Sequence, residues 1–165
     1  MASVTYRNAA KEDSALILEF IKELAVYEKL AHEVIATEAD IARTLFEGTP
    51  RAFCMIAELD HKPVGFALCF YNYSTFQGKY GIYIEDLYVR EDYRGHGIGK
   101  GFFYEIARRA KEEDCGRIQW WVLNWNTPSI EFYKSLGAEA MDEWTVFRLG
   151  PEQIQNMAQE TKNAA

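Results

Sequence analysis

Cysteine is scarce in this 165-residue sequence, and its pattern excludes a disulfide framework. Cys54, Cys69 and Cys115 are far apart, form no CxxC motif and are odd in number, which favours a reducing compartment. Each stands among apolar residues, so we expect packing residues rather than a nucleophile. The sequence also lacks an H-x-x-x-H pair and a cysteine cluster, so we expect no metal site.

Long hydrophobic runs and an excess of positive charge are also missing. No stretch approaches 18 uninterrupted apolar residues, and the first residues lack the basic and apolar regions of a signal peptide. The 18 basic and 25 acidic residues leave a net charge of −7, which disfavours nucleic acid and anionic membranes as partners. We therefore expect a cytoplasmic protein, whose charge serves either solubility or the binding of a cationic ligand.

The length predicts one domain, residues 1–165, with residues 160–165 as a loose tail. Alternating apolar residues predict strands, and helical spacing predicts helices between them. The expected order is a mixed α/β sheet, antiparallel in its middle, with one β-α-β crossover. The expected strands span 4–7, 52–59, 64–73, 82–89, 117–123 and 144–149, and the expected helices begin near 14, 37, 98, 127 and 151.

Capping signals mark several of these boundaries. Asp13 and Ser14 are suited to cap the first helix, and Thr37 with Asp40 matches a capping box at the start of the second. Residues 60–63 are suited to a hairpin loop between two strands. Gly137 is placed to end the helix that starts at 127.

A glycine-rich turn, Arg94-Gly95-His96-Gly97-Ile98-Gly99, follows one strand and opens a helix. Glycines allow close approach of the backbone to a ligand, and the N–H groups of a first helical turn bind anions. Gly101 stands where a Walker A motif needs Ser or Thr, and Phe102 stands where a dinucleotide fingerprint needs Gly or Ala. The turn is therefore either a pyrophosphate site of another kind or an ordinary glycine-rich turn.

Three further segments extend this pattern, and together they resemble the GNAT acyltransferase superfamily. Arg94-x-x-Gly97-x-Gly99 after Ile84-Glu85-Asp86-Leu87-Tyr88-Val89 looks like its acetyl-CoA motif. The segment from Trp125-Asn126-x-Pro128-Ser129 to Tyr133-Lys134-x-x-Gly137-Ala138 looks like its second motif. Tyr27-Glu28-Lys29-Leu30 and Tyr83-Ile84-Glu85-Asp86 are similar to the spermidine/spermine N-acetyltransferase subfamily, which includes diamine and thialysine acetyltransferases.

The resemblance implies a GNAT-type fold and a binding site for acetyl-CoA as acyl donor. The pyrophosphate would lie on the backbone amides of the glycine turn, and the pantetheine arm would pair with the preceding strand like an additional strand. The residues implied in cofactor binding are Leu87, Tyr88, Val89, Arg94, Gly95, His96, Gly97, Ile98, Gly99, Asn126, Ser129 and Tyr133.

The resemblance also implies two catalytic residues. Tyr133 matches the general acid, and a phenol with an ordinary pKa of about 10 can protonate a departing thiolate. Glu85 matches the base, acting directly or through water, beside Asp86 on what we expect to be the opposite face of a strand. Without the resemblance, Tyr133 would be interpreted as a packing residue and the carboxylates as an exposed or ion-paired set.

An acidic slot with aromatic walls suits a cationic acceptor amine. Glu28, Glu85 and Asp86 would form the slot, and Tyr27 and Phe76 would form its walls. The loop Ser74-Thr75-Phe76 lacks the acidic residue and Trp of the polyamine branch and looks more like the thialysine branch.

These features favour an N-acetyltransferase that acts on a diamine, polyamine or lysine-like amine by direct attack in a ternary complex. The resemblance also implies a homodimer. The alternatives are another amine acceptor (an amino acid, an aminoglycoside or a protein lysine) or a non-catalytic acyl-CoA sensor.

Overall fold

The computed structural model describes residues 3–163 of the chain and divides it into two compact units, Met1–Thr127 and Pro128–Ala165. The first unit contains a five-stranded mixed sheet with helices on both faces, and the second contains most of one helix and all of another. The expected α/β class is confirmed. A single domain over residues 1–165 stays a prediction.

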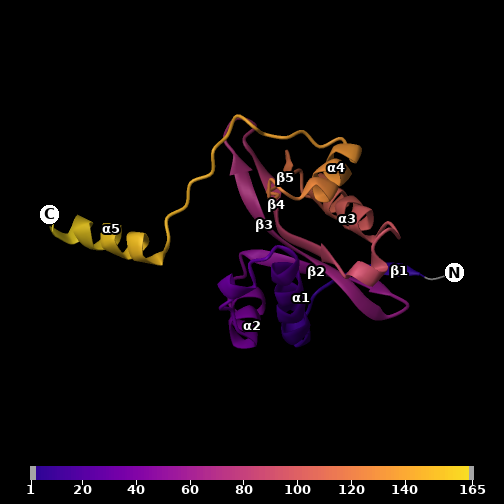
Figure 1. Cartoon of the computed structure of the whole chain (residues 1–165). Helices are drawn as coiled ribbons and strands as arrows, with labels where there is room; N and C mark the ends of the chain where they lie inside the picture. Colours follow the sequence, from indigo (N-terminus) through magenta and orange to yellow (C-terminus); the bar gives the residue numbers. More distant parts are fainter. Residues whose placement is uncertain (1–2, 164–165) are drawn as a thin grey trace. The chain divides into compact units, whose positions relative to one another are not determined.

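The strands lie in sequence order across the sheet, β1-β2-β3-β4-β5 (Figure 1). The first three pairings are antiparallel, and β4 pairs with β5 in parallel through the expected crossover. The strands are β1 (Val4–Asn8), β2 (Ala52–Leu59), β3 (Lys62–Ser74), β4 (Lys79–Val89) and β5 (Ile118–Trp120). The helices are α1 (Ser14–Tyr27), α2 (Glu38–Phe46), α3 (Ile98–Glu112), α4 (Thr127–Ser135) and α5 (Pro151–Asn163), with short 3-10 turns at Lys11–Asp13, Ala31–Glu33 and Glu91–Tyr93.

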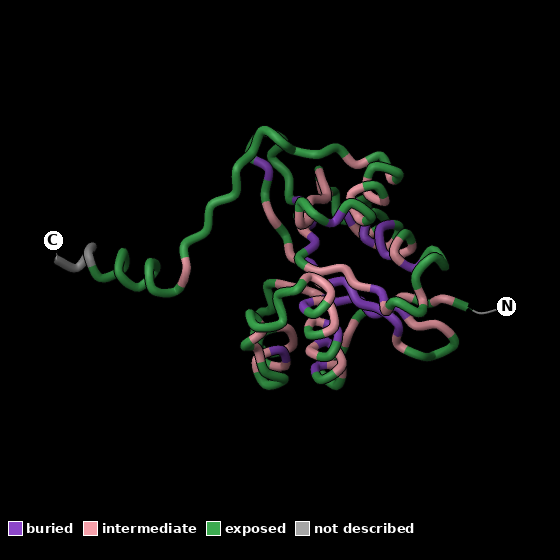
Figure 2. The backbone as a smooth tube through the Cα atoms, viewed as in Figure 1, coloured by how far each residue is buried: buried purple, intermediate pink, exposed green. Residues whose placement is uncertain are grey.

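The core of the first unit lies on both faces of the sheet, and Figure 2 shows its buried residues along β2, β3, β4 and the inner sides of α1 and α3. On the α1 face, Phe20 stacks on Phe66 with ring centroids 5.4 Å apart. On the α3 face, the fully buried Phe102 meets Tyr6 edge to face at 5.0 Å. Apolar spacing therefore predicts the inner faces of these helices correctly.

Two strand predictions were wrong: one expected strand is absent, and another is shorter than expected. Residues 144–149 belong to no strand, although their apolar pattern fits one, and Phe147 is 91% exposed. A strand requires a neighbouring ladder for its backbone hydrogen bonds, which local sequence cannot provide. The strand expected over 117–123 is reduced to β5, because it pairs only with Ile82–Ile84 of β4.

The boundaries between elements also differ from expectation in two places. Asp60 and His61 both have positive φ (49° and 65°), so β2 and β3 are joined by a two-residue turn instead of a four-residue loop. Helix α5 continues to Asn163, past the start of the expected loose tail, and residues 164–165 lie outside the described residues.

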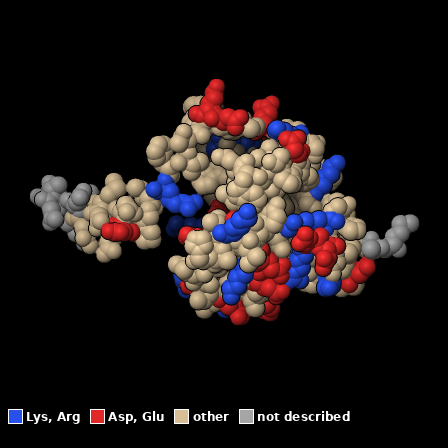
Figure 3. Space-filling view, viewed as in Figure 1, with Lys and Arg blue, Asp and Glu red and all other residues tan. Residues whose placement is uncertain are grey.

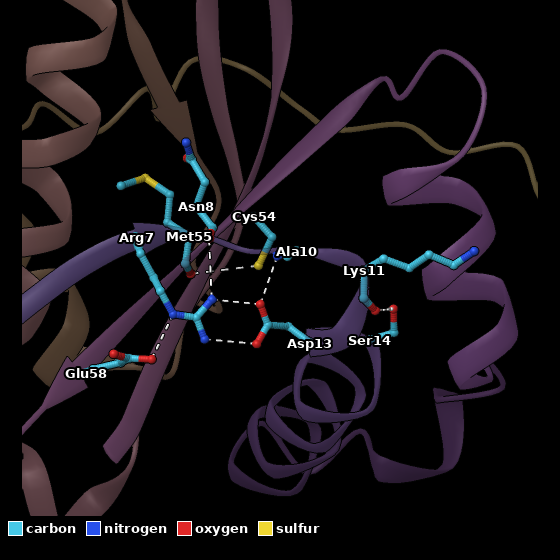
Figure 4. A network of polar contacts seen from close by, with 9 residues as sticks. All are labelled: Arg7, Asn8, Ala10, Lys11, Asp13, Ser14, Cys54, Met55 and Glu58. Carbon is cyan, nitrogen blue, oxygen red and sulfur yellow. Dashed lines mark hydrogen bonds and ion pairs between the residues drawn. The ribbon is translucent and has the colours of Figure 1, made fainter. Parts of the chain in front are cut away.

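The capping box at Thr37 is confirmed, because the Thr37 hydroxyl accepts a hydrogen bond from the Asp40 backbone N–H. Asp13 occupies the N-cap position of α1, as expected, but its side chain makes no capping hydrogen bond. Figure 4 shows its carboxylate turned toward Arg7, which donates to it at 2.7 and 2.9 Å and to Glu58 at 2.7 Å. The Asp13 carboxylate also accepts from the Ala10 backbone N–H, so it ties the start of α1 to β1 and β2.

A close approach between α3 and β1 requires a glycine at position 101. A Cβ atom built there would lie 1.8 Å from the Tyr6 hydroxyl oxygen, far inside any permitted contact. The Tyr6 hydroxyl donates to the Ile98 carbonyl at 2.9 Å, so it cannot move away without losing this bond. Packing against Tyr6 thus explains why position 101, where a Walker A motif needs Ser or Thr, is occupied by glycine.

We predict that Gly101→Ala lowers the free energy of unfolding by about 1–3 kcal/mol, because the added methyl group displaces Tyr6. Urea unfolding measures the change. The control is Lys100→Ala, at the exposed neighbouring position, which we expect to change stability by less than about 0.5 kcal/mol. Equal stability of Gly101→Ala and the wild type would contradict the packing argument.

Candidate active site

The glycine turn lies between β4 and α3, and its backbone geometry depends on glycine. Gly95 and Gly97 have φ of 79° and 76°, and a Cβ at either position would meet no atom within 4 Å. Gly97 is the N-cap of α3, so the N–H groups of the first turn of a 15-residue helix begin directly after it. The Nδ1 atom of His96 lies 2.9 Å from the Arg94 carbonyl, to which it must donate. The turn is therefore a suitable anion site.

The two arginines around this turn have different partners. Arg90 is ion-paired with Glu19 and Glu23 of α1, which compensate its charge. Arg94 instead donates from Nε to the Val89 carbonyl at 2.9 Å, and none of the described carboxylates in residues 3–159 is ion-paired with it. Its positive charge therefore lies uncompensated beside the glycine turn.

The β4 strand changes its neighbours just before the turn. On one side it is paired with β3 from Lys79 to Val89, except at Glu85. On the other side it is paired only at Ile82–Ile84 with β5, so in the described part of the chain residues 85–89 face no strand there. Leu87, Tyr88 and Val89 thus lie on a strand whose β5 side is open for backbone hydrogen bonds.

A bulge in β4 sets the direction of the two adjacent carboxylates. Leu68 is opposite Asp86, and the next residue, Cys69, is opposite Ile84, so Glu85 has no partner in the ladder. The expected strict alternation of Glu85 and Asp86 between opposite faces therefore does not hold. Glu85 is exposed, whereas Asp86 is half-buried.

Three carboxylates gather around this bulge. Burial, together with the negative charges of Glu85 and Glu28, raises the pKa of Asp86 to about 7. Burial also raises the pKa of Glu28, which is the C-cap of α1. Carboxylates held close together and partly shielded from water form a suitable site for a cation.

Tyr27 connects the glycine turn with the segment before α4. Its ring lies beneath the Arg94 guanidinium, 4.8 Å from ring centroid to Cζ. Its hydroxyl donates to Oδ1 of Asn126 at 3.1 Å, and Asn126 is buried. Two expected cofactor residues, Arg94 and Asn126, are thus joined by a residue expected in the acceptor site.

The remaining expected residues are placed less centrally. Phe76 lies in the turn between β3 and β4 and is 98% exposed, so its ring forms no wall with Tyr27 in this structure. Ser129 and Tyr133 lie in α4 within the second unit, where the half-buried Tyr133 ring is 5.5 Å from Phe132. The roles of all three stay predictions.

Comparison with known proteins agrees with this arrangement. A model of the acetyltransferase (GNAT) family matches residues 18–138. The chain belongs to this family. The thialysine N-epsilon-acetyltransferase of Bos taurus is 37% identical over 169 residues, covering 96% of this chain and 99% of that protein. The L-ornithine N5-acetyltransferase NATA1 of Arabidopsis thaliana is 30% identical, covering 90% and 85%.

A solved structure with the same fold is the integron cassette protein VCH_CASS6 from the mobile metagenome of V. cholerae. Its TM-score is 0.80 at 24% identity, and the match covers 94% of this acetyltransferase and 98% of that chain. The resemblance to the spermidine/spermine (diamine and thialysine) N-acetyltransferase subfamily is thus confirmed, and with it the expectation of an acetyltransferase.

The sequence analysis did not predict several aromatic and cation–π contacts around Tyr27 and Arg94. The Tyr88 ring lies 5.6 Å from the Arg94 guanidinium, and the Trp125 ring lies 6.1 Å from Tyr27. Lys29 in turn lies over Trp125 at 5.3 Å. These residues are distant in sequence, and no local spacing brings them together.

Other groups in the acetyltransferase have no evident part in the site. Burial raises the pKa of the Cys54 and Cys69 thiols, which disfavours their nucleophilic thiolate forms. Among the described side chains, those of residues 3–159, no group of three or more potential ligands could hold a metal ion. In the same range, no helix combines the length and the apolar character needed to cross a membrane.

Figure 3 shows acidic and basic side chains close together on the displayed face of the first unit.

We predict that Asp86→Asn stabilises the acetyltransferase increasingly as pH rises from about 4 to about 7. The unfolded Asp86 carboxyl ionises near its ordinary pKa of about 4, whereas the folded one keeps its proton to about 7. The wild type therefore loses stability across this window relative to the variant, by at most about 1.4 kcal/mol per pH unit, with no further change above it.

Urea unfolding of both proteins at several pH values measures this difference. The control is Asp92→Asn, which removes a carboxyl group at an exposed position in the turn after β4. A constant difference between Asp86→Asn and the wild type would show that Asp86 has an ordinary pKa.

Proposed function

We propose that this acetyltransferase transfers the acetyl group of acetyl-CoA to the primary amine of a small cationic acceptor of lysine-like (thialysine) or diamine type. The observation that carries the proposal is that one strand, β4, leads from the carboxylates at its bulge to the anion-binding glycine turn. The similarity to a thialysine acetyltransferase and an ornithine acetyltransferase supports an amino-acid acceptor with a terminal amine.

The donor half of the site fits a nucleotide thioester. The N–H groups of residues 95–99 and the uncompensated Arg94 suit a diphosphate. The β5 side of Leu87–Val89 lies open for an arm that contains amides, because buried amides require hydrogen-bond partners. Asn126 and Ser129 would bind the same arm, as the resemblance implies.

The acceptor half fits a short cation. An ammonium group beside Glu28, Glu85 and Asp86 would favour the ionised form of Asp86 and lower its pKa. The β3–β4 turn supplies no carboxylate, since residues 74–78 are Ser-Thr-Phe-Gln-Gly. A long polyamine would therefore lack a second anionic partner at this turn.

In the proposed reaction, Glu85 accepts a proton from the acceptor ammonium, directly or through water. The free amine nitrogen forms a bond to the thioester carbonyl carbon, and the C–S bond breaks. Tyr133 donates its phenolic proton to the departing thiolate, and the second proton that the new amide nitrogen must lose passes to the Tyr133 phenolate, directly or through water, which restores the phenol. No acetyl-cysteine is formed, which agrees with the raised pKa of Cys54 and Cys69. A homodimer in the cytoplasm stays a prediction.

We predict that thialysine is acetylated with a kcat/KM roughly tenfold or more above that of spermine, since each lost contact to a charged group costs about 1.5–3 kcal/mol. Release of free CoA thiol from acetyl-CoA measures the rates with putrescine, spermidine, spermine, lysine, ornithine, thialysine and a basic peptide. Tight CoA binding without thiol release for any amine would identify an acyl-CoA sensor instead. Release with the peptide alone would identify a protein-lysine acetyltransferase.

We predict that Tyr133→Phe lowers kcat by about 10²–10⁴-fold, because the thiolate then departs without a positioned acid. The affinity for acetyl-CoA should change by less than about twofold, because the ring is retained. Thiol release and calorimetric titration measure the two quantities, and Tyr104→Phe, on the exposed face of α3, is the control. An unchanged kcat would remove Tyr133 from the mechanism.

A further inference from the structure

We infer that Tyr27 is a positioning residue that orients Arg94 and Asn126, two residues of the proposed donor site, and that it is not a wall of the acceptor slot. This inference rests on the proposed function, since it assigns roles within the same site. It is carried by two separate contacts of one side chain: the face of its ring with Arg94, and its hydroxyl with Asn126.

The first contact fixes the direction of Arg94. The guanidinium lies 4.8 Å from the centroid of Tyr27 and 5.6 Å from that of Tyr88, and its Nε donates to the Val89 carbonyl. Aromatic rings and a carbonyl orient this cation without neutralising it, unlike the carboxylates around Arg90. Arg94 thus keeps its charge for an anion at the glycine turn.

The second contact fixes the orientation of Asn126. The Tyr27 hydroxyl donates to Oδ1 at 3.1 Å, so Oδ1 is the acceptor and the amide NH₂ lies on the other side of the group. Asn126 also donates its backbone N–H to the Leu123 carbonyl at 2.8 Å and directly precedes Thr127, where α4 begins. Tyr27 therefore defines the orientation of the buried Asn126 amide within the first unit.

The place of Tyr27 on α1 makes both contacts possible at once. It is the last residue of α1, and its ring also packs against Trp125, 6.1 Å away. The adjacent Glu28 belongs to the carboxylate group around the β4 bulge. A shift of the end of α1 would thus disturb the donor and acceptor sites together.

The two contacts can be separated by substitution. Tyr27→Phe removes the hydroxyl and keeps the ring beneath Arg94, whereas Tyr27→Leu removes both. We expect Tyr27→Phe to lower kcat by about 3–10-fold, the effect of one hydrogen bond, with the KM for acetyl-CoA within about twofold of wild type. We expect Tyr27→Leu to raise, in addition, the KM for acetyl-CoA and the Kd for CoA by about 2–5-fold over those of Tyr27→Phe.

A truncated donor tests whether the ring acts through Arg94. Acetyl-pantetheine lacks the diphosphate, so the KM values of Tyr27→Leu and Tyr27→Phe should be equal with it while they differ with acetyl-CoA. A purely structural defect would affect both donors alike, and that result would overturn the role of the ring. Tyr104→Leu is the matched control, since Tyr104 is exposed and lies under Lys100 in a similar cation–π contact, at 5.5 Å.

A double substitution tests whether the hydroxyl acts through Asn126. If it does, Tyr27→Phe should have no further effect on kcat in an Asn126→Ala background. Independent, multiplicative losses would overturn this half of the inference. Thermal unfolding of each variant shows whether it is folded.

Binding of CoA, measured by calorimetry without an acceptor, separates this inference from the proposed function. Binding without transfer to any amine would reject the proposed function, while the Kd ratio of Tyr27→Leu to Tyr27→Phe would still decide the role of the ring. A ratio near one would overturn that role even in an active enzyme. A wild type that does not bind CoA would overturn both.

Discussion

The antiparallel pairing of β3 with β4 is interrupted by one unpaired residue, Glu85. This pairing determines which side chains of β4 lie on the α1 face of the sheet. The residues of β3 that share the α1 face, Phe66 and Leu68, lie opposite Tyr88 and Asp86. Beyond Glu85 the register is shifted by one, so Tyr83 lies opposite Phe70 on that same face. Without the bulge, either Asp86 or Tyr83 would be turned to the other side. The face of the sheet on which Asp86 and the following residues of β4 lie therefore depends on a single register shift.

Charge compensation distinguishes Arg94 from two other arginines of this acetyltransferase. Arg7 and Arg90 are each held by two carboxylates and connect β1 or β4 to α1. Arg94 is held by aromatic rings and a backbone carbonyl. Asp86, by contrast, has neighbours of its own charge, and these carboxylates together with burial raise its pKa to about 7. The positive charge at the turn and the negative charges at the bulge lie on opposite ends of a short stretch of β4.

Sequence reasoning predicted those features that depend on neighbours along the chain. The inner faces of α1 and α3, the Thr37 cap and the start of α3 at the glycine turn arise within a few residues. The bulge at Glu85, the contact of Arg94 with Tyr27 and the diversion of Asp13 to Arg7 arise between elements far apart in sequence. The strand expected at 144–149 failed for the same reason, because its pairing partner is not encoded locally. The residues in the site were found chiefly through the family resemblance, and their roles stay proposals.

The contact between Gly101 and Tyr6 has a consequence for how this turn can evolve. A nucleotide-hydrolysing loop would require a hydroxyl-bearing side chain at position 101 to coordinate magnesium. Here that space is occupied by a phenol from the opposite edge strand, β1, which is bonded to the Ile98 carbonyl. Acquiring such a loop would require a second, simultaneous change in the first few residues of the chain. The edge of the sheet farthest from β5 thereby restricts the ligand chemistry open to descendants of this protein.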